Sequence, residues 1–208
     1  MKYANHFLLF SLFIVFFLGP LAFDLGIASI VDIEMLFLFI LISSVFLLKK
    51  NSKIFKLAVA LLIVIIINNF LFNFNQSLFQ YTLKILIITL TIFELFKQII
   101  QTKIIDAGMV SGGISIYILI GVFWYLLFMA LVTVHPNSFH FASYETSSVS
   151  VEMVYFSFIT LTTLGYGDIT PISYTAKMWA ITEAITGVMY IAVMISRLVS
   201  LLKQKNKD

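Results

Sequence analysis

The chain has 208 residues, of which 61% are hydrophobic and only 11% are charged, and its mean hydropathy is +1.06. This composition excludes a soluble globular domain and indicates a protein that lies mostly in a lipid bilayer. The net charge of +3 does not indicate a nucleic-acid partner, since the bases stand at the ends of apolar stretches, and the absence of cysteine excludes disulfides, thiolate metal sites and cysteine nucleophiles.

Four apolar stretches follow one another in the first hundred residues. A helix needs about 20 apolar residues to cross a hydrocarbon core of about 30 Å. The stretches cover residues 6–23, 33–48, 54–72 and 78–100. The first is broken late by Gly19-Pro20, and the second is short. Together they predict a four-span peripheral domain over residues 1–100.

The fourth stretch has the position of a voltage-sensing helix but not its charges. Such a helix carries Arg or Lys at every third residue, so that several charges can move through the membrane field. Here every third position after Lys84 is apolar as far as Phe96. We expect Lys84 to snorkel from near the outer end. We expect a polar patch near the cytoplasmic end, formed by Glu94, Lys97, Gln98 and Gln101.

The second half begins with a linker at residues 101–112, which is followed by a second domain at 113–208. The linker contains glycines, which predicts a flexible break and not a stiff helix. Two further apolar stretches, 114–134 and 175–202, are long enough to cross the membrane. The stretch 150–163 between them is too short to do so.

Residues 160–168 read TLTTLGYGD and are the most informative segment of the chain. A carbonyl-lined ion filter needs extended backbone whose oxygens all turn toward one axis. Glycine adopts positive φ without a Cβ penalty, so Gly165 and Gly167 let the intervening peptide groups point the same way. The Thr163 hydroxyl can add a ligand at the inner end.

The segment TTLGYGD, with the aromatic run VYFSF before it and ITP after it, resembles the pore module of the tetrameric potassium channel family. The resemblance covers residues from about 113 to 202. It implies an outer helix, a re-entrant pore helix at 150–163, a selectivity filter and an inner helix. The expected fold is an all-α integral membrane protein with six transmembrane helices, arranged as a fourfold symmetric homotetramer. It is of the six-span bacterial type without an arginine ladder.

The resemblance also assigns roles to residues. Those expected to bind K⁺ are Thr163, Leu164, Gly165, Tyr166 and Gly167. Those expected to support the filter are Tyr155, Phe156, Thr160, Thr162 and Asp168. Relatives often have tryptophan at the aromatic positions, where it donates a hydrogen bond to the acid. Phe156 cannot donate one, so Tyr155 is the candidate partner of Asp168, and the stiffness of the outer filter becomes a question.

Two residues of the inner helix have alternative interpretations. Gly187 lies where the family often has a hinge, but small residues also allow close helix packing. Glu183 is a carboxylate in an apolar span, which is costly. It either presents charge near the cavity or accepts hydrogen bonds behind the pore helix from hydroxyls such as that of Ser157. Helical spacing places Val188, Ile191 and Ile195 toward the cavity.

Most of the 13 basic residues lie in residues 1–5, 49–56, 97–103 and 197–207. The positive-inside rule therefore predicts a multi-pass protein with cytoplasmic N- and C-termini. The family resemblance implies the cell membrane of a prokaryote. We expect the lipid bilayer and three further copies of the chain as partners. We expect no nucleic acid, no soluble regulatory domain in this chain, and no cofactor or metal apart from K⁺ as the permeant ion.

These patterns predict a potassium-selective channel that conducts K⁺ passively, without strong intrinsic voltage gating. One alternative keeps the pore but makes it a non-selective cation channel, which the intact GYG disfavours. The other is a potassium transporter, although such proteins usually carry four degenerate repeats in one longer chain and this sequence has one. No nucleophile and base pair or phosphate-binding loop is recognisable in the sequence, so we do not expect an enzyme.

Overall fold

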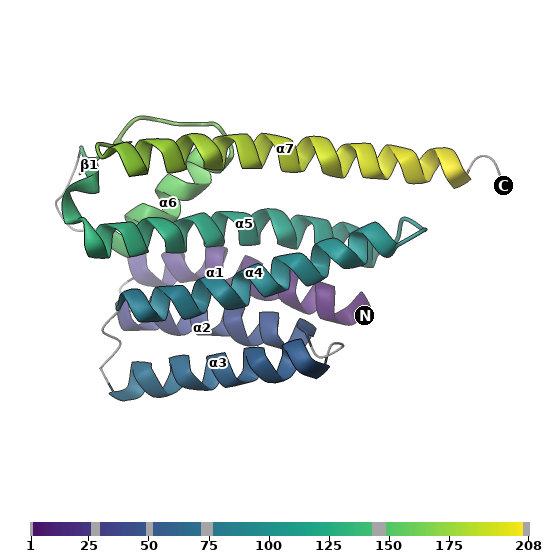
Figure 1. The fold of residues 1–208 in the computed structure, drawn as a ribbon, viewed down its shortest axis with the longest axis horizontal. Helices are drawn as coiled ribbons and strands as arrows, with labels where there is room; N and C mark the ends of the chain where they lie inside the picture. The colour runs from purple at the N-terminus through teal and green to yellow at the C-terminus, as the bar shows by residue number, and fades with distance from the viewer. Residues whose placement is uncertain (1, 26–29, 49–51, 72–76, 143–148, 206–208) are drawn as a thin grey trace. The chain divides into compact units, whose positions relative to one another are not determined.

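The computed structural model describes residues 2–25, 30–48, 52–71, 77–142 and 149–205. Those residues form a mostly helical protein with one small antiparallel sheet (Figure 1). The helices are α1 (Lys2–Asp24), α2 (Ile30–Leu47), α3 (Ser52–Leu71), α4 (Leu78–Gln101), α5 (Ala107–Val134), α6 (Val149–Leu161) and α7 (Tyr174–Lys205). The sheet pairs β1 (Phe139–Phe141) with β2 (Ile169–Pro171), and the 3-10 helix η2 (Pro136–Ser138) precedes β1.

Each predicted apolar stretch corresponds to a helix, and the short stretch before the filter is α6. The predicted linker is different, because α5 already begins at Ala107 and includes the linker glycines Gly108 and Gly112. Asn5 Nδ2 donates to the Gly108 carbonyl at 2.9 Å, and a Cβ on Gly112 would lie 3.1 Å from the same amide nitrogen. Gly112 therefore allows α1 to approach α5 closely, and this part of the predicted linker is helix instead of a flexible break.

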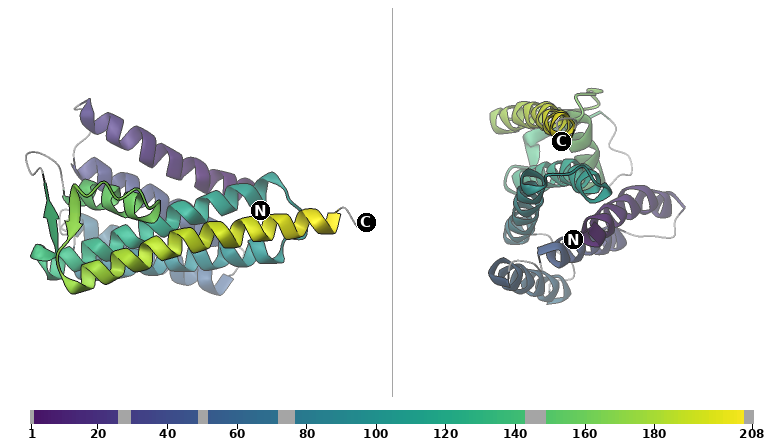
Figure 2. Two further views of the ribbon diagram at one scale, coloured as in Figure 1. Left: turned by 90° about the horizontal axis from the view of Figure 1, so that it is seen from above. Right: turned by 90° about the vertical axis from the view of Figure 1, so that its right-hand side faces the viewer.

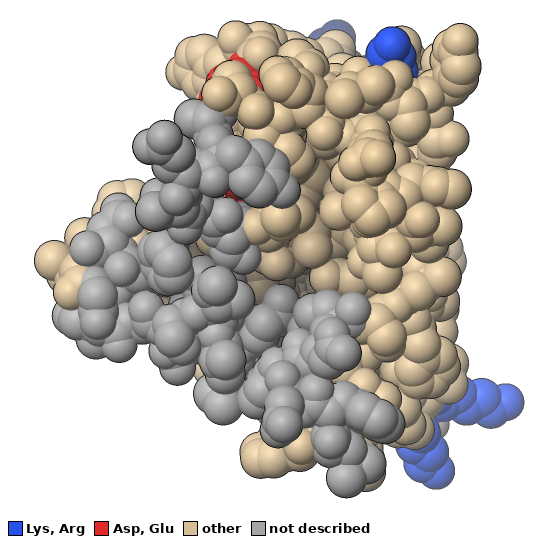
Figure 3. Space-filling view, turned by 90° about the vertical axis from the view of Figure 1, so that its left-hand side faces the viewer, with Lys and Arg blue, Asp and Glu red and all other residues tan. Residues whose placement is uncertain are grey.

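Four helices among the described residues are long and apolar enough to cross a membrane, namely α1, α3, α5 and α7. The apolar part of α2 that the structure describes, Phe37–Leu47, is shorter. Helix α4 carries Lys84, Glu94 and Lys97 and is not among the four. Figure 3 shows a described surface with few charged side chains. The chain is thus an all-α membrane protein apart from its small sheet.

The chain divides into two compact units, and the boundary falls inside α5. The first unit comprises residues 1–102 and 106–118, and the second comprises 103–105 and 119–208. In the first unit α2 packs against α1, α3 and α4 (Figure 2). Its core consists of aliphatic side chains such as Leu8, Leu12, Ile40, Ile65, Ile87 and Leu95. The basic cluster at residues 49–56 lies partly outside the described residues.

Helix α4 buries a line of polar side chains, which the sequence interpretation did not anticipate. They are Gln80, Lys84, Thr91, Glu94 and Gln98, and their spacing places them on one face of the helix. Lys84 is 4% exposed and its Nζ lies 5.6 Å from the centre of the Tyr81 ring. The expectation that Lys84 snorkels to the membrane surface is therefore wrong, because this face of α4 points into the unit.

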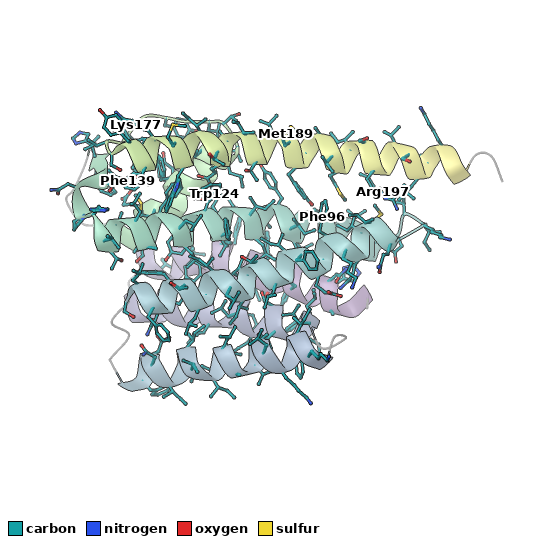
Figure 4. The ribbon with its side chains drawn as sticks, in the orientation of Figure 1. Phe96, Trp124, Phe139, Lys177, Met189 and Arg197 are labelled. Carbon is teal, nitrogen blue, oxygen red and sulfur yellow. The ribbon has the colours of Figure 1, made fainter. Side chains whose placement is uncertain are left out.

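In the second unit the short helix α6 packs against α7, and the two strands pair beside it. Phe139 lies opposite Pro171 and Phe141 opposite Ile169. Rings from α5, β1 and α6 form a cluster in which Phe128, Phe139 and Phe156 contact one another edge to face at 5.2 to 5.5 Å. Trp124, which is labelled with Phe139 in Figure 4, extends the cluster along α5.

Candidate functional site

The backbone after α6 has positive φ at every second residue. The angle is 62° at Thr163, 52° at Gly165 and 83° at Gly167. The positive φ that the sequence predicted for the two glycines is therefore present. Thr163 was not expected to share it, because a β-branched residue pays a steric cost in the left-handed region. Alternation of this kind favours carbonyl groups that turn toward one side.

The side chains of residues 162–167 lie on the surface of the chain. Leu164 is 59% exposed and Tyr166 is 70% exposed. A Cβ added to Gly165 or Gly167 would meet no atom within 4 Å. The segment thus forms one open wall, whereas a carbonyl cage around an ion needs walls on all sides.

The inner end of this segment is hydrogen-bonded to the last turns of α6. Leu164 N donates to the Ile159 carbonyl at 2.8 Å and Gly165 N donates to the same oxygen at 3.1 Å. Thr163 N donates to the carbonyl of Thr160 at 3.0 Å. These carbonyls belong to the helix end, where they lack partners from a following turn. The position of α6 therefore determines the path of the filter segment.

The outer end of the segment is held at Asp168. The Tyr155 hydroxyl donates to Asp168 Oδ2 at 2.7 Å, and Ile169 N donates to Oδ1 at 3.0 Å. The amide of Ala142, directly after β1, donates to the Asp168 carbonyl at 2.9 Å. The hydrogen bond to the carboxylate is the main reason why the pKa of Tyr155 is raised to about 12. Tyr155 thus makes the contact for which the sequence left it as the remaining candidate.

Phe156 has a different environment from the one that the resemblance implied. Its ring is buried against Phe128 and Phe139, with ring centres 5.2 Å apart in both pairs. It anchors α6 to α5 and β1, so any support for the filter is indirect. Thr162, also expected to support the filter, follows α6 directly. Its hydroxyl donates to the Phe158 carbonyl of that helix at 2.6 Å.

Glu183 lies behind α6 and is fully buried. Its Oε1 is 2.5 Å from Ser157 Oγ, and the same Oγ is 2.8 Å from the Gly121 carbonyl of α5. This geometry agrees with the interpretation in which the acid is hydrogen-bonded behind the pore helix, and not with the one in which its charge faces an open cavity. Ser157 joins three helices, and the sequence indicated only one of its two contacts.

Gly187 allows α7 to cross the end of α6 closely. A Cβ at this position would overlap the backbone carbonyl of Leu161. Gly121 of α5 is crowded in a similar way by a side chain of α6, since a Cβ there would lie 2.6 Å from Cζ of Phe158. Gly187 therefore has the close packing that one of its two interpretations predicted, and the hinge stays a prediction. A sequence signal for the Gly121 contact was lacking, because one small residue in an apolar helix is common.

The remaining part of α7 is largely uncovered within one chain. Val188, Ile191 and Ile195, expected to face a cavity, are each about half exposed. Only 11% of the apolar part of α7, Tyr174–Lys203, is buried, which leaves a long apolar surface. Among the described residues no group of three or more His, Cys, Asp or Glu side chains could hold a metal ion.

Comparison with known proteins places the similarity in this second half of the chain. Residues 113–204 match the family model described as "Ion channel". A 60-residue segment is 40% identical to Two-pore potassium channel 4 of Arabidopsis thaliana, which is 29% of this chain and 21% of that protein. A second relative from the same plant, Two-pore potassium channel 3, is 34% identical over 85 residues, or 41% of this chain and 17% of that protein.

A bacterial protein shows a similar match. Protein LctB of Bacillus caldotenax is 36% identical over 91 residues, which is 44% of this chain and 62% of that protein. In each of these relatives the matched part is less than two thirds of the length. No solved structure matches the chain. Residues 113–204 of this membrane protein are therefore similar to an ion-channel family, and segments of the chain are similar to potassium channels.

Proposed function

We propose that the protein is a potassium-selective channel that conducts K⁺ passively through a pore lined by backbone carbonyls. The alternating positive φ at Thr163, Gly165 and Gly167 is the observation that carries the proposal. Backbone carbonyls of this segment and the Thr163 hydroxyl would replace the hydration shell of the ion, as in carbonyl-lined filters generally. The residues expected to bind K⁺ are Thr163, Leu164, Gly165, Tyr166 and Gly167.

The pore requires more than one chain. Each chain contributes one TTLGYGD segment, which is exposed, and one α7 whose apolar surface is mostly uncovered. Identical copies around one axis would cover both surfaces. A homotetramer with six spans per chain is the arrangement that the resemblance supports. Both termini are then cytoplasmic, as the distribution of bases suggests, and the resemblance supports the cell membrane of a prokaryote.

A reversal potential tests selectivity. The purified full chain is placed in a planar bilayer with K⁺ on one side and Na⁺ on the other. We expect reversal near the potassium equilibrium potential and block by Ba²⁺. Gly165→Ala should abolish selective conduction because alanine is strained at this φ of 52°. Ile172→Ala, at an exposed position beyond the filter, is the matched control. Reversal near zero would instead favour a non-selective cation channel.

We also propose that voltage does not strongly gate this channel. A steep response requires several charges that move through the field. The buried face of α4 carries one base, Lys84, and one acid, Glu94. The open probability should therefore change only weakly from about −100 to about +100 mV. A steep sigmoid equivalent to several charges would contradict this part of the proposal.

A further inference from the structure

Ser157 Oγ lies within hydrogen-bonding distance of two oxygen atoms from two other helices. One is the Gly121 carbonyl of α5 at 2.8 Å, and the other is Oε1 of Glu183 in α7 at 2.5 Å. Both Ser157 and Glu183 are fully buried. Two oxygens approach this closely only when a hydrogen lies between them.

The number of available hydrogens limits how these contacts can form. A serine hydroxyl has a single hydrogen, a carbonyl is only an acceptor, and an ionised carboxylate is also only an acceptor. Two contacts around one Oγ need two hydrogens. If Ser157 donates to the Gly121 carbonyl, the second hydrogen has to come from Glu183.

The other oxygen of Glu183 leads to the same conclusion independently. Oε2 is buried and has no hydrogen-bond partner among the described residues. In an ionised carboxylate this atom would carry about half of the negative charge, and leaving it unpaired in an apolar span is costly. In a neutral carboxyl group Oε2 is an ordinary carbonyl oxygen, for which the cost is smaller.

We propose that Glu183 carries a proton and donates it to Ser157, which donates in turn to the Gly121 carbonyl, so that one hydrogen-bonded chain positions the pore helix between α5 and α7. The contact is extended one turn further along both helices. Ser157 and Leu161 are four residues apart on α6, and Glu183 and Gly187 are four apart on α7. The backbone carbonyl of Leu161 packs against Gly187. Two successive turns of α7 are thus held against α6.

The hydrogen bonds from Glu183 through Ser157 to Gly121 affect the filter through the position of α6. The carbonyl of Ile159, two residues beyond Ser157, accepts the amides of Leu164 and Gly165. A shift of α6 would therefore move the backbone of the filter segment. Glu183 is a positioning residue in this scheme, since it touches neither the ion nor the filter. This consequence for selectivity rests on the proposed channel function, whereas the protonation state does not.

Infrared difference spectroscopy tests the proton directly. Spectra of the full wild-type chain and Glu183→Gln in lipid at neutral pH are subtracted. We expect loss of a carbonyl stretch that belongs to a protonated carboxylic acid. In Ser157→Ala the same band should move to higher frequency, because the acid loses its acceptor. Loss of carboxylate bands in Glu183→Gln, or an unmoved band in Ser157→Ala, would overturn the proposal.

Permeability measurements test the positioning role. Glu183→Gln retains an N–H donor for Ser157 and should keep the wild-type ratio of K⁺ to Na⁺ permeability. Glu183→Leu removes the donor and should lower the ratio by about tenfold, an effect of the size expected for one buried hydrogen bond. A wild-type ratio in Glu183→Leu would contradict the role. If the wild type itself is unselective, the channel proposal fails, and the infrared result still decides whether Glu183 is protonated.

Discussion

Asp168 accepts hydrogen bonds from three residues. They are Tyr155 of α6, Ile169 at the start of β2, and Ala142 directly after β1. In the family that the sequence resembles, a tryptophan often donates the hydrogen bond to this acid. Here the donors are the phenol of Tyr155 and two backbone amides. Two of the three donors are backbone amides, which are insensitive to most substitutions.

Removing the Tyr155 hydroxyl should weaken the outer end of the filter. We expect Tyr155→Phe to make K⁺ currents decay several-fold faster during sustained opening, because Asp168 loses a charge-assisted hydrogen bond. Tyr155→Trp, whose indole N–H can donate, serves as the control and should restore slow decay. The measurement is the decay time constant at fixed voltage. Equal time constants for the wild type and Tyr155→Phe would show that the backbone donors suffice.

The same bond should be insensitive to pH over the usual range. The pKa of Tyr155 is raised from 10.0 to about 12 by its hydrogen bond to Asp168. A pKa raised by folding means that the stabilisation is fully present below pH 10 and is lost as the pH rises through about 12. The difference in decay between wild type and Tyr155→Phe should thus be constant from about pH 7 to about pH 9.

Sequence reasoning identified the glycines of the segment and the role of Tyr155 because both depend on local chemistry. Positive φ is cheap at Gly165 and Gly167, and a carboxylate near a phenol suggests a hydrogen bond. Positive φ at Thr163 could not be predicted, since nothing in a β-branched side chain favours it. The second contact of Ser157 was also hidden, because it joins residues 36 positions apart.

At the scale of elements, α6 is held between α5 and α7 by two glycines. Gly121 meets the ring of Phe158, and Gly187 meets the carbonyl of Leu161. Helices without side-chain atoms at the crossing approach each other closely, which strengthens packing in lipid. The helices themselves were predictable from long apolar runs. The strands were not, because three residues are too few for a periodic pattern.

A pair of substitutions tests the α5–α6 crossing. Gly121→Ala should destabilise the protein by about 1–3 kcal/mol, because the new methyl group overlaps the Phe158 ring. Phe158→Leu in the same chain removes the end of the ring and should recover most of this loss. The measurement is thermal unfolding of the purified protein for both single variants and the double variant. Additive effects in the double variant would show that the two residues do not contact each other.

At the scale of the molecule, one chain leaves its filter segment and most of α7 uncovered. A pore built from several copies would place part of α7 against water and part against other subunits. The family resemblance of the sequence predicted that several copies assemble. Sequence reasoning could not predict that α4 buries Lys84, since the charge pattern alone does not say which face of a helix points inward.

Single cysteines on α7 test the pore, and the natural chain has no cysteine to interfere. Ile191→Cys should allow a water-soluble, charged thiol reagent to block K⁺ current by most of its amplitude, because the side chain is expected to face the cavity. The wild type is the control and should be unaffected. Cross-linking of the same preparation should give species up to four chains. Full current after modification of Ile191→Cys would exclude this orientation of α7.

The contact between Asn5 and the Gly108 carbonyl has a consequence for how the protein is made. The two residues are 103 positions apart, and Asn5 is buried. At about 5–20 residues per second, roughly 5–20 s of synthesis separate them. During that interval the amide of Asn5 is without its final acceptor in an apolar segment. Helix α1 can therefore complete this contact only after the start of α5 has been made.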